Sequence, residues 1–225
     1  MPWIYSATPF LVSTLPGPTT RFRQLTRLSE VTSSLALTPE ERAWMLKEWP
    51  DLFPVDYVDY LSNYRFKPEQ AKIVFVPAPG ESDLGTIELE FVGPWHETIL
   101  WEVPAMSCLS EVYFKTMDTD WNYDGQAKRT HEKTRQMLSG GCLVAEFGAR
   151  RRRSYEAQDI VIESMLRASQ ELKGPGHVIG TSNVRDRPTF CSLTALNWVS
   201  QVHFAHKYKT KPIGTVAQSV YFLVA

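Results

Sequence analysis

The chain has few cysteines, almost no net charge and no long apolar run. Its 225 residues include three cysteines, Cys108, Cys142 and Cys191, which lie far apart. An odd number at this spacing forms neither a disulfide framework nor a metal-binding motif, so we expect a reducing compartment, the cytoplasm. A formal net charge of −1 argues against a dedicated nucleic-acid-binding protein. No apolar run reaches membrane-spanning length, so we expect neither nucleic acid nor a membrane as a partner.

The first residues lack acidic side chains. Residues 1–29 contain no Asp or Glu but three arginines. This composition weakly resembles that of a transit peptide. Prolines at positions 2, 9, 16 and 18 exclude an amphipathic helix there. We therefore predict an irregular start over residues 1–34.

Helix and strand signals then follow one another over residues 35–141. Thr38-Pro39-Glu40-Glu41 is typical of a capped helix start, with Glu41 closing a capping box, and predicts a helix to about residue 49. A second helix is predicted over residues 55–64, where tyrosines recur on one face. We interpret this tyrosine stripe as packing rather than as a ligand cage.

Two alternating β-branched segments, residues 72–76 and 86–92, predict an antiparallel pair of strands with one wet face. An apolar helix is predicted over residues 95–116, with a kink at Pro104. A polar helix is predicted at the surface over residues 125–138. Together these elements predict an N-terminal α/β domain over residues 35–141.

A buried strand is predicted over residues 143–147, followed at Gly148 by four consecutive arginines, 150–153. A helix is predicted over residues 155–172, with Ser154 as its cap. Arginine forks and the positive end of a helix dipole suit phosphate or carboxylate oxygens. The alternatives are a solvated charge run, a nuclear-localisation patch or a nucleic-acid contact.

Further strands are predicted over residues 177–181 and 212–217, with a helix over residues 202–208. Strands that alternate with helices predict parallel pairing, and ligands bind at the carboxyl ends of such strands. Three strands cannot close a (β/α)₈ barrel of about 250 residues. We therefore expect an incomplete domain over residues 142–225.

Several segments, taken together and in order, resemble the nicotinate phosphoribosyltransferase family, fungal type. The matching segments are Gly93-Pro94-Trp95, residues 99–104, Thr119-Asp120-Trp121, residues 146–154, Gly180-Thr181-Ser182-Asn183 and residues 212–215.

The resemblance implies a type II phosphoribosyltransferase fold, with an N-terminal α/β domain and the first strands of an irregular α/β barrel. It implies formation of nicotinate mononucleotide and pyrophosphate from nicotinate and phosphoribosyl pyrophosphate, driven by ATP hydrolysis. ATP and Mg²⁺ are co-substrates in the family, no cofactor is bound covalently, and family members are usually homodimers. No protein metal site is expected.

The resemblance also implies residue roles. Phe147 matches a residue that stacks on the pyridine ring, and Arg150 and Arg151 match arginines that face the substrate carboxylate and phosphates. Thr215 matches a ligand-contacting threonine. Ser182 stands where the related nicotinamide-using enzyme has an Asp, which would repel a carboxylate, so serine favours nicotinate.

The sequence departs from the family at residues 184–201. The family continues directly from Asn183 into the Val-His pair seen here at Val202-His203. One interpretation is a translated intron, because codons for Val184 and Gln201 can supply the GT and AG boundaries. The alternative is a genuine loop insertion.

A second departure concerns the histidine that ATP phosphorylates in the family, because Gln218 stands at its position. An amide lacks the required nucleophilic nitrogen, so no catalytic residue is assigned. His203 and His206 do not match that position and are interpreted as surface or packing residues. We expect an inactive chain; the alternative is a non-catalytic isoform that pairs with the full-length enzyme.

Overall fold

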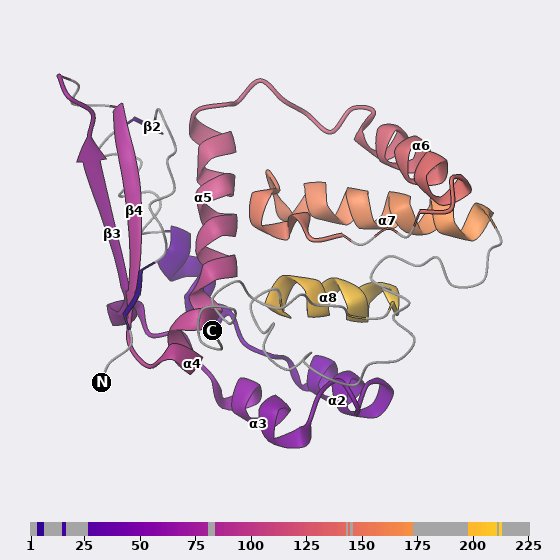
Figure 1. Cartoon of the computed structure of the whole chain (residues 1–225), viewed down its shortest axis with the longest axis horizontal. Coiled ribbons are helices and arrows are strands. Elements are labelled where there is room, and N and C mark those ends of the chain that lie inside the picture. The colour runs from indigo at the N-terminus through magenta and orange to yellow at the C-terminus, as the bar shows by residue number, and fades with distance from the viewer. Residues whose placement is uncertain are drawn as a thin grey trace. The chain divides into compact units, whose positions relative to one another are not determined.

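The computed structural model describes residues 4–6, 15–16, 27–80, 84–142, 144, 146–172, 198–210 and 212 (Figure 1). The chain forms two compact units. The first comprises Met1–Ala36 and Tyr64–Trp121, and the second comprises Leu37–Asn63 and Asn122–Ala225. This division groups residues differently from the sequence-based domains 35–141 and 142–225, which remain a prediction.

An antiparallel sheet organises the first unit. Strand β3 (Ala71–Pro77) pairs with β4 (Leu84–Val92), so that Ile73 lies opposite Leu89. In β4 the alternate side chains Ile87, Leu89 and Phe91 are buried while Glu88 is exposed. This confirms the predicted antiparallel pair with one wet face.

The predicted irregular start was wrong for the residues that the structure describes. Strand β1 (Ile4–Ser6) pairs with one end of β4, and β2 (Leu15–Pro16) pairs with the other. Residues 27–34 form a helix. Prolines exclude a long helix but are tolerated in short edge strands. The edge of β4 that does not face β3 has backbone N–H and C=O groups that need partners, and β1 and β2 supply them.

The predicted helix over residues 95–116 is divided. Helix α4 (Trp95–Thr98) leads into a 3₁₀ turn, η2 (Ile99–Trp101), and then into α5 (Glu102–Thr116). The break falls in the turn before Pro104. A proline ring clashes with the carbonyl four residues earlier, and proline has no backbone N–H to donate to it. A short 3₁₀ turn, η1 (Pro68–Gln70), precedes β3.

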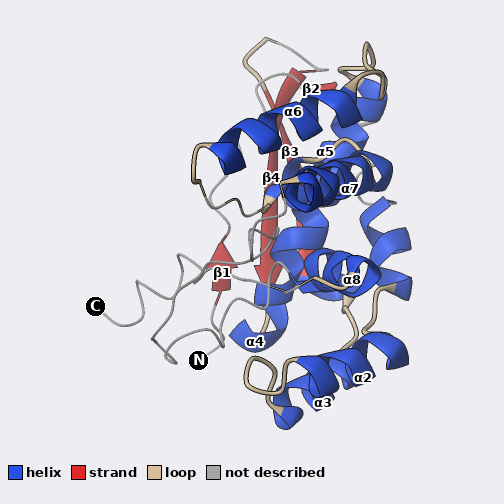
Figure 2. Cartoon of the chain, turned by 90° about the vertical axis from the view of Figure 1, so that its right-hand side faces the viewer, coloured by secondary structure: helices blue, strands red, loops and turns tan. Residues whose placement is uncertain are grey.

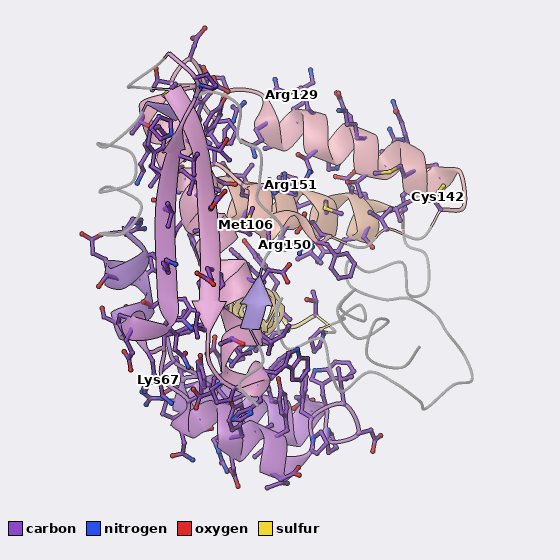
Figure 3. The ribbon with its side chains drawn as sticks, turned by 60° about the vertical axis from the view of Figure 1, so that its left-hand side comes forward. Lys67, Met106, Arg129, Cys142, Arg150 and Arg151 are labelled. Atoms are coloured by element: carbon purple, nitrogen blue, oxygen red, sulfur yellow. The ribbon has the colours of Figure 1, made fainter. Side chains whose placement is uncertain are left out.

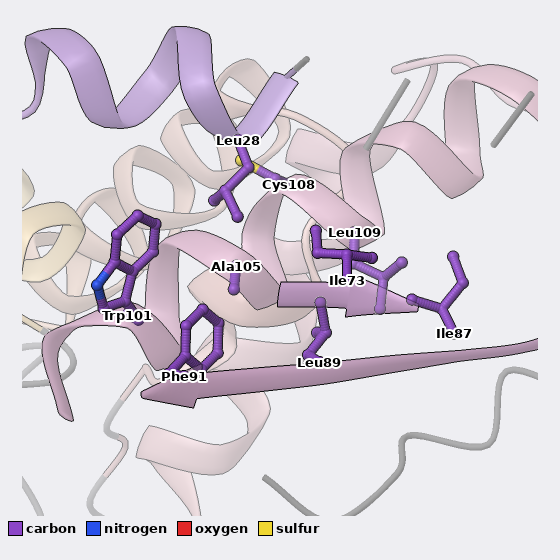
Figure 4. Packing of buried hydrophobic residues seen from close by; sticks show 9 residues of the cluster. All are labelled: Leu28, Ile73, Ile87, Leu89, Phe91, Trp101, Ala105, Cys108 and Leu109. Carbon is purple, nitrogen blue, oxygen red and sulfur yellow. The ribbon is translucent and has the colours of Figure 1, made fainter. Parts of the chain in front are cut away.

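The core of the first unit lies between the sheet and α5 (Figure 4). Trp101 is 1% exposed, stacks on Phe91 with ring centroids 5.5 Å apart, and donates its indole N–H to Gln70 at 3.2 Å. Burying one large aromatic side chain stabilises a fold by roughly 1.5–3 kcal/mol. The other members are Leu28, Ile73, Ile87, Leu89, Ala105, Cys108 and Leu109.

The described part of the second unit is helical (Figure 2). Its elements are α2 (Pro39–Glu48), α3 (Val55–Asn63), α6 (Gln126–Ser139), the 3₁₀ turn η3 (Gly148–Arg151), α7 (Tyr155–Glu171) and α8 (Trp198–Tyr208). The predicted capping box is confirmed, since Thr38 Oγ1 accepts from the Glu41 N–H and the Glu41 carboxylate accepts from the Thr38 N–H.

Helix α8 packs against both α2 and α7. Val202 joins a buried cluster with Met45, Phe53 and Val58, and Phe204 stacks on Tyr155 at 5.1 Å between ring centroids. The prediction of a helix over residues 202–208 is confirmed, and α8 also takes in residues 198–201 at the end of the predicted insertion. Extending an existing helix is easier than nucleating one, and these residues include neither Gly nor Pro.

The predicted strand over residues 143–147 was wrong at the residues described there, because Val144, Glu146 and Phe147 are not paired in a strand. A strand needs a neighbour to satisfy its backbone groups. Its expected neighbours, 177–181 and 212–217, lie outside the described residues apart from Pro212. None of the described helices is both long and apolar enough to cross a membrane.

Candidate functional site

The candidate site is the arginine turn, which we define as η3, Gly148–Arg151. Phe147 directly precedes it, and Arg152, Arg153 and Ser154 connect it to α7. Figure 3 shows the side chains of Arg150 and Arg151 on the segment that leads into α7. The structure thus places Arg150 and Arg151 on a turn, directly after Phe147, instead of at a strand end.

A buried carboxylate holds this turn. The Glu146 side chain is 7% exposed, and its Oε1 accepts from the Gly148 N–H at 2.6 Å and from Arg152 Nη2 at 2.7 Å. Its Oε2 accepts from Gln158 Nε2. Arg152 Nε also donates to Gln158 Oε1 at 2.6 Å. A buried charge is tolerated only when it is paired and hydrogen-bonded, and the network meets that need.

Gly148 is required by this close approach. A Cβ atom at Gly148 would lie 2.5 Å from Glu146 Oε1 and 2.8 Å from Arg152 Nη2. Both atoms belong to the network and are held by other hydrogen bonds. The glycine therefore lets the backbone N–H reach the carboxylate.

The arginines at positions 150, 151 and 152 have different environments. Arg152 is committed to Glu146 and Gln158, whereas Arg151 is exposed and Arg150 is half-buried. Phe147 is also half-buried. Arg151 therefore offers an accessible guanidinium, which suits an anionic ligand through charge-assisted hydrogen bonds.

Helix α7 begins at the predicted cap. Ser154 Oγ accepts from the Ala157 N–H at 3.0 Å and lies 2.7 Å from the Tyr123 hydroxyl. The Gln126 amide donates to the Ala157 carbonyl at 3.1 Å. These contacts attach the start of α7 to α6 and its preceding loop, which fixes the helix that follows the turn.

The remaining predicted site residues, Ser182, Thr215 and Gln218, lie outside the described residues. His203 contacts Glu41 Oε1 at 3.3 Å and the Tyr155 hydroxyl at 2.9 Å. The His206 ring lies 5.5 Å from that of Trp44. Both histidines of α8 therefore make packing contacts. Among the described residues, no three His, Cys, Asp or Glu side chains gather as a metal site would require.

Sequence reasoning gave no role to Glu146, Arg152 or Gln158. A signal was present for Glu146, because a carboxylate within the apolar stretch Leu-Val-Ala-Glu-Phe needs a partner if that stretch is buried. Gln158 gave no such signal, since a glutamine in the second turn of a helix is ordinary.

Two family profiles match the chain. The profile of the nicotinate phosphoribosyltransferase N-terminal domain matches residues 12–110, and that of the nicotinate phosphoribosyltransferase family matches residues 142–223. This chain belongs to the nicotinate phosphoribosyltransferase family.

Two relatives illustrate the match to this family. A nicotinate phosphoribosyltransferase of Methanosarcina mazei is 36% identical over 84% of this chain and 43% of its own length. That of Saccharomyces cerevisiae is 35% identical over 73% of this chain and 35% of its own length. The chain therefore spans less than half of the length of these curated relatives.

Solved structures of the family share the fold. A yeast nicotinate phosphoribosyltransferase structure matches with a TM-score of 0.78 and 29% identity, covering 97% of this chain and 49% of the yeast chain. A structure from Porphyromonas gingivalis matches with a TM-score of 0.70 at 23% identity, covering 91% of this chain and 45% of that one. The chain thus has the α/β fold of part of a type II phosphoribosyltransferase.

Proposed function

We propose that the arginine turn is a substrate-binding part of a nicotinate phosphoribosyltransferase of NAD salvage. One observation carries the proposal: in a chain of this family, Arg150 and Arg151 lie on a turn that a buried carboxylate holds, and Phe147 directly precedes that turn. Nicotinate and phosphoribosyl pyrophosphate are both anions. An aromatic side chain and guanidinium groups on nearby residues of one segment suit a pyridine carboxylate and phosphates.

The reaction class gives these groups a task. The pyridine nitrogen donates its electron pair to the ribose C1 atom, and the bond from C1 to pyrophosphate breaks. Pyrophosphate leaves with that electron pair, so negative charge grows on its oxygens. Arginines positioned beforehand stabilise such charge without reorganisation. We assign this role to Arg150 and Arg151, ring stacking to Phe147, and further substrate contacts to Ser182 and Thr215.

ATP hydrolysis to ADP and phosphate would drive the reaction, with Mg²⁺ entering together with the polyphosphates. The histidine that takes the phosphoryl group in the family is replaced by Gln218, whose amide is not a nucleophile. We therefore propose that this chain, as written, binds substrates without turning them over. We place it in the cytoplasm, and a second copy is its expected partner.

Binding and turnover are tested separately on the purified 225-residue chain. Calorimetric titration should detect nicotinate or phosphoribosyl pyrophosphate, and Arg151→Ala should weaken that binding by roughly tenfold to a hundredfold, the value of a charge-assisted hydrogen bond. Absence of any binding by the unaltered chain would refute the binding role. Steady production of nicotinate mononucleotide would refute inactivity.

The insertion has its own test, which is sequencing of the transcript across codons 184–201. Absence of those codons would support the intron interpretation, and the expressed protein would then lack residues 184–201. Their presence would favour the second candidate function, a non-catalytic isoform that pairs with the full-length enzyme. Co-purification of both chains after co-expression would support that candidate, and separate elution would argue against it.

A further inference from the structure

The hydrogen-bond network that holds the arginine turn pairs specific donors with specific acceptors. Four hydrogen bonds join Glu146, Gly148, Arg152 and Gln158. The donors are the Gly148 N–H, two guanidinium N–H groups and the Gln158 amide nitrogen. The acceptors are the two Glu146 oxygens and the Gln158 amide oxygen. Each of these donors meets one of these acceptors, so exchanging a donor for an acceptor at position 146 or 158 disrupts at least one of the four bonds.

The same network assigns different tasks to neighbouring arginines. Glu146 neutralises Arg152 in a buried setting, with side-chain exposures of 7% and 31%. Its bond to the Gly148 N–H fixes the first residue of the turn. The position of Arg150 and Arg151 relative to α7 therefore depends on residues that need not touch the ligand, since the Gln158 side chain lies on α7 and is only 3% exposed.

We propose that Glu146 and Gln158 are positioning residues, which hold the arginine turn through Arg152 and the Gly148 N–H so that Arg150 and Arg151 face an anionic substrate. This inference rests on the proposed function. Arg152 belongs to the holding network, and its loss acts through the turn instead of through a direct ligand contact. Preorganised donors bind anions more strongly because less ordering is needed on binding.

Single isosteric changes disturb the donor count. In Glu146→Gln, whichever way the two amides are turned, one N–H group faces another. In Gln158→Glu, two carboxylates face each other without a donor between them. The reciprocal swap, Glu146→Gln with Gln158→Glu, restores all four bonds, because the new amide donates to the new carboxylate and Arg152 keeps an acceptor at each nitrogen. Side-chain lengths are unchanged at both positions.

The first measurement is calorimetric titration of pyrophosphate into the full chain and these three variants. We expect each single variant to bind at least about tenfold more weakly, and the swap to recover affinity to within about threefold of the unaltered chain. Unchanged binding in the single variants would overturn the inference. So would a folded swap variant that binds no better than either single variant.

The second measurement needs no ligand. Trypsin cleaves after arginine, and mass spectrometry resolves cleavage at Arg150 to Arg153 from cleavage at Arg167, which is exposed on α7. We expect Glu146→Gln to speed cleavage in the turn severalfold while cleavage at Arg167 stays constant, and the swap to restore protection. Equal acceleration at both places indicates general loss of structure and overturns the positioning role.

The two measurements separate the inference from the function on which it rests. If the unaltered chain binds neither pyrophosphate nor either substrate but the turn is protected as expected, the proposed function fails and the holding network stands. If binding is normal and the turn is cleaved equally in all variants, the proposed function stands and the positioning role fails.

Discussion

At position 148 the packing leaves no room for a side chain larger than that of glycine. Its backbone N–H donates to Glu146, and the space where a Cβ atom would lie is already taken by Glu146 Oε1 and Arg152 Nη2. Neither atom is the free end of a mobile side chain, because both are hydrogen-bonded within the network. The requirement is steric and local to the candidate site.

We expect Gly148→Ala to lower the free energy of unfolding of the second unit by about 1–3 kcal/mol, the usual cost of overpacking. Urea denaturation followed by circular dichroism measures this. Gly140→Ala is the matched control, because a Cβ atom there meets its neighbours at 3.4 Å and 3.5 Å, an ordinary contact distance. Equal stability of the two variants would contradict the steric argument.

At the scale of elements, helix starts and helix docking position the site. Ser154 caps α7 and contacts Tyr123, so the cap also ties α7 to the loop before α6. Helix α8 is held on α7 through Asp159, whose carboxylate accepts from Lys207 Nζ at 2.7 Å and from the Tyr208 hydroxyl at 2.7 Å. Both attachments involve the N-terminal turns of α7, next to the arginine turn.

We expect Ser154→Ala to lower the free energy of unfolding by about 1 kcal/mol, since it removes the acceptor for the Ala157 N–H. Ser154→Thr, which keeps a capping hydroxyl, should lie close to the unaltered chain. Thermal denaturation of the three proteins compares them. A loss in the threonine variant as large as in the alanine variant would show that the cap is not the cause.

The attachment of α8 to α7 through Asp159 should weaken at acid pH. Burial pushes the pKa of Asp159 up, but hydrogen bonds from Lys207 and Tyr208 outweigh it, so its pKa lies below the ordinary 3.8. A depressed carboxyl pKa stabilises the fold above the unfolded value, and this stabilisation is lost as pH falls from about 4 through the folded pKa.

Asp159→Asn should therefore remove less than about 1 kcal/mol of stability at neutral pH, because the pair is partly exposed and screened. It should also flatten the stability change below pH 4. Denaturation at pH 7, 4 and 3 measures both effects. An unchanged slope below pH 4 would contradict the assignment to Asp159.

At the scale of the whole molecule, the two units have separate cores and can be followed separately. Cys108 belongs to the core of the first unit and is 2% exposed, whereas Cys142 in the second unit is exposed. Burial raises the pKa of the Cys108 thiol to about 12. Cys108 is therefore protected both by lack of access and by lack of thiolate.

We expect iodoacetamide to label Cys142 at least about tenfold faster than Cys108 in the folded chain at pH 8, because the thiolate is the reactive species. Peptide mass spectrometry measures each site. Increasing urea should expose Cys108 in step with the unfolding of the first unit. Equal labelling rates without urea would contradict the buried core at Cys108.

Local signals in the sequence were enough for several helices, among them α2, α7 and α8, and for the strand pair. The capping box at Thr38 and the Ser154 cap depend on neighbouring residues alone. The alternation in β4 has a period set by strand geometry. The motif from Glu146 to Ser154, with its arginines, also indicates the family and the candidate site, because it is a matter of residue types and their order.

Contacts between distant residues had to come from the tertiary structure. Strands β1 and β2 form because β4 has a second edge to fill, and no local pattern in a proline-rich start reveals a partner about eighty residues away. The segment expected as a strand over 143–147 leads instead into a turn held by Gln158. Strand pairing depends on which strands meet in space, and burial of the Glu146 carboxylate depends on which donors meet it there. The order of residues in the sequence fixes neither.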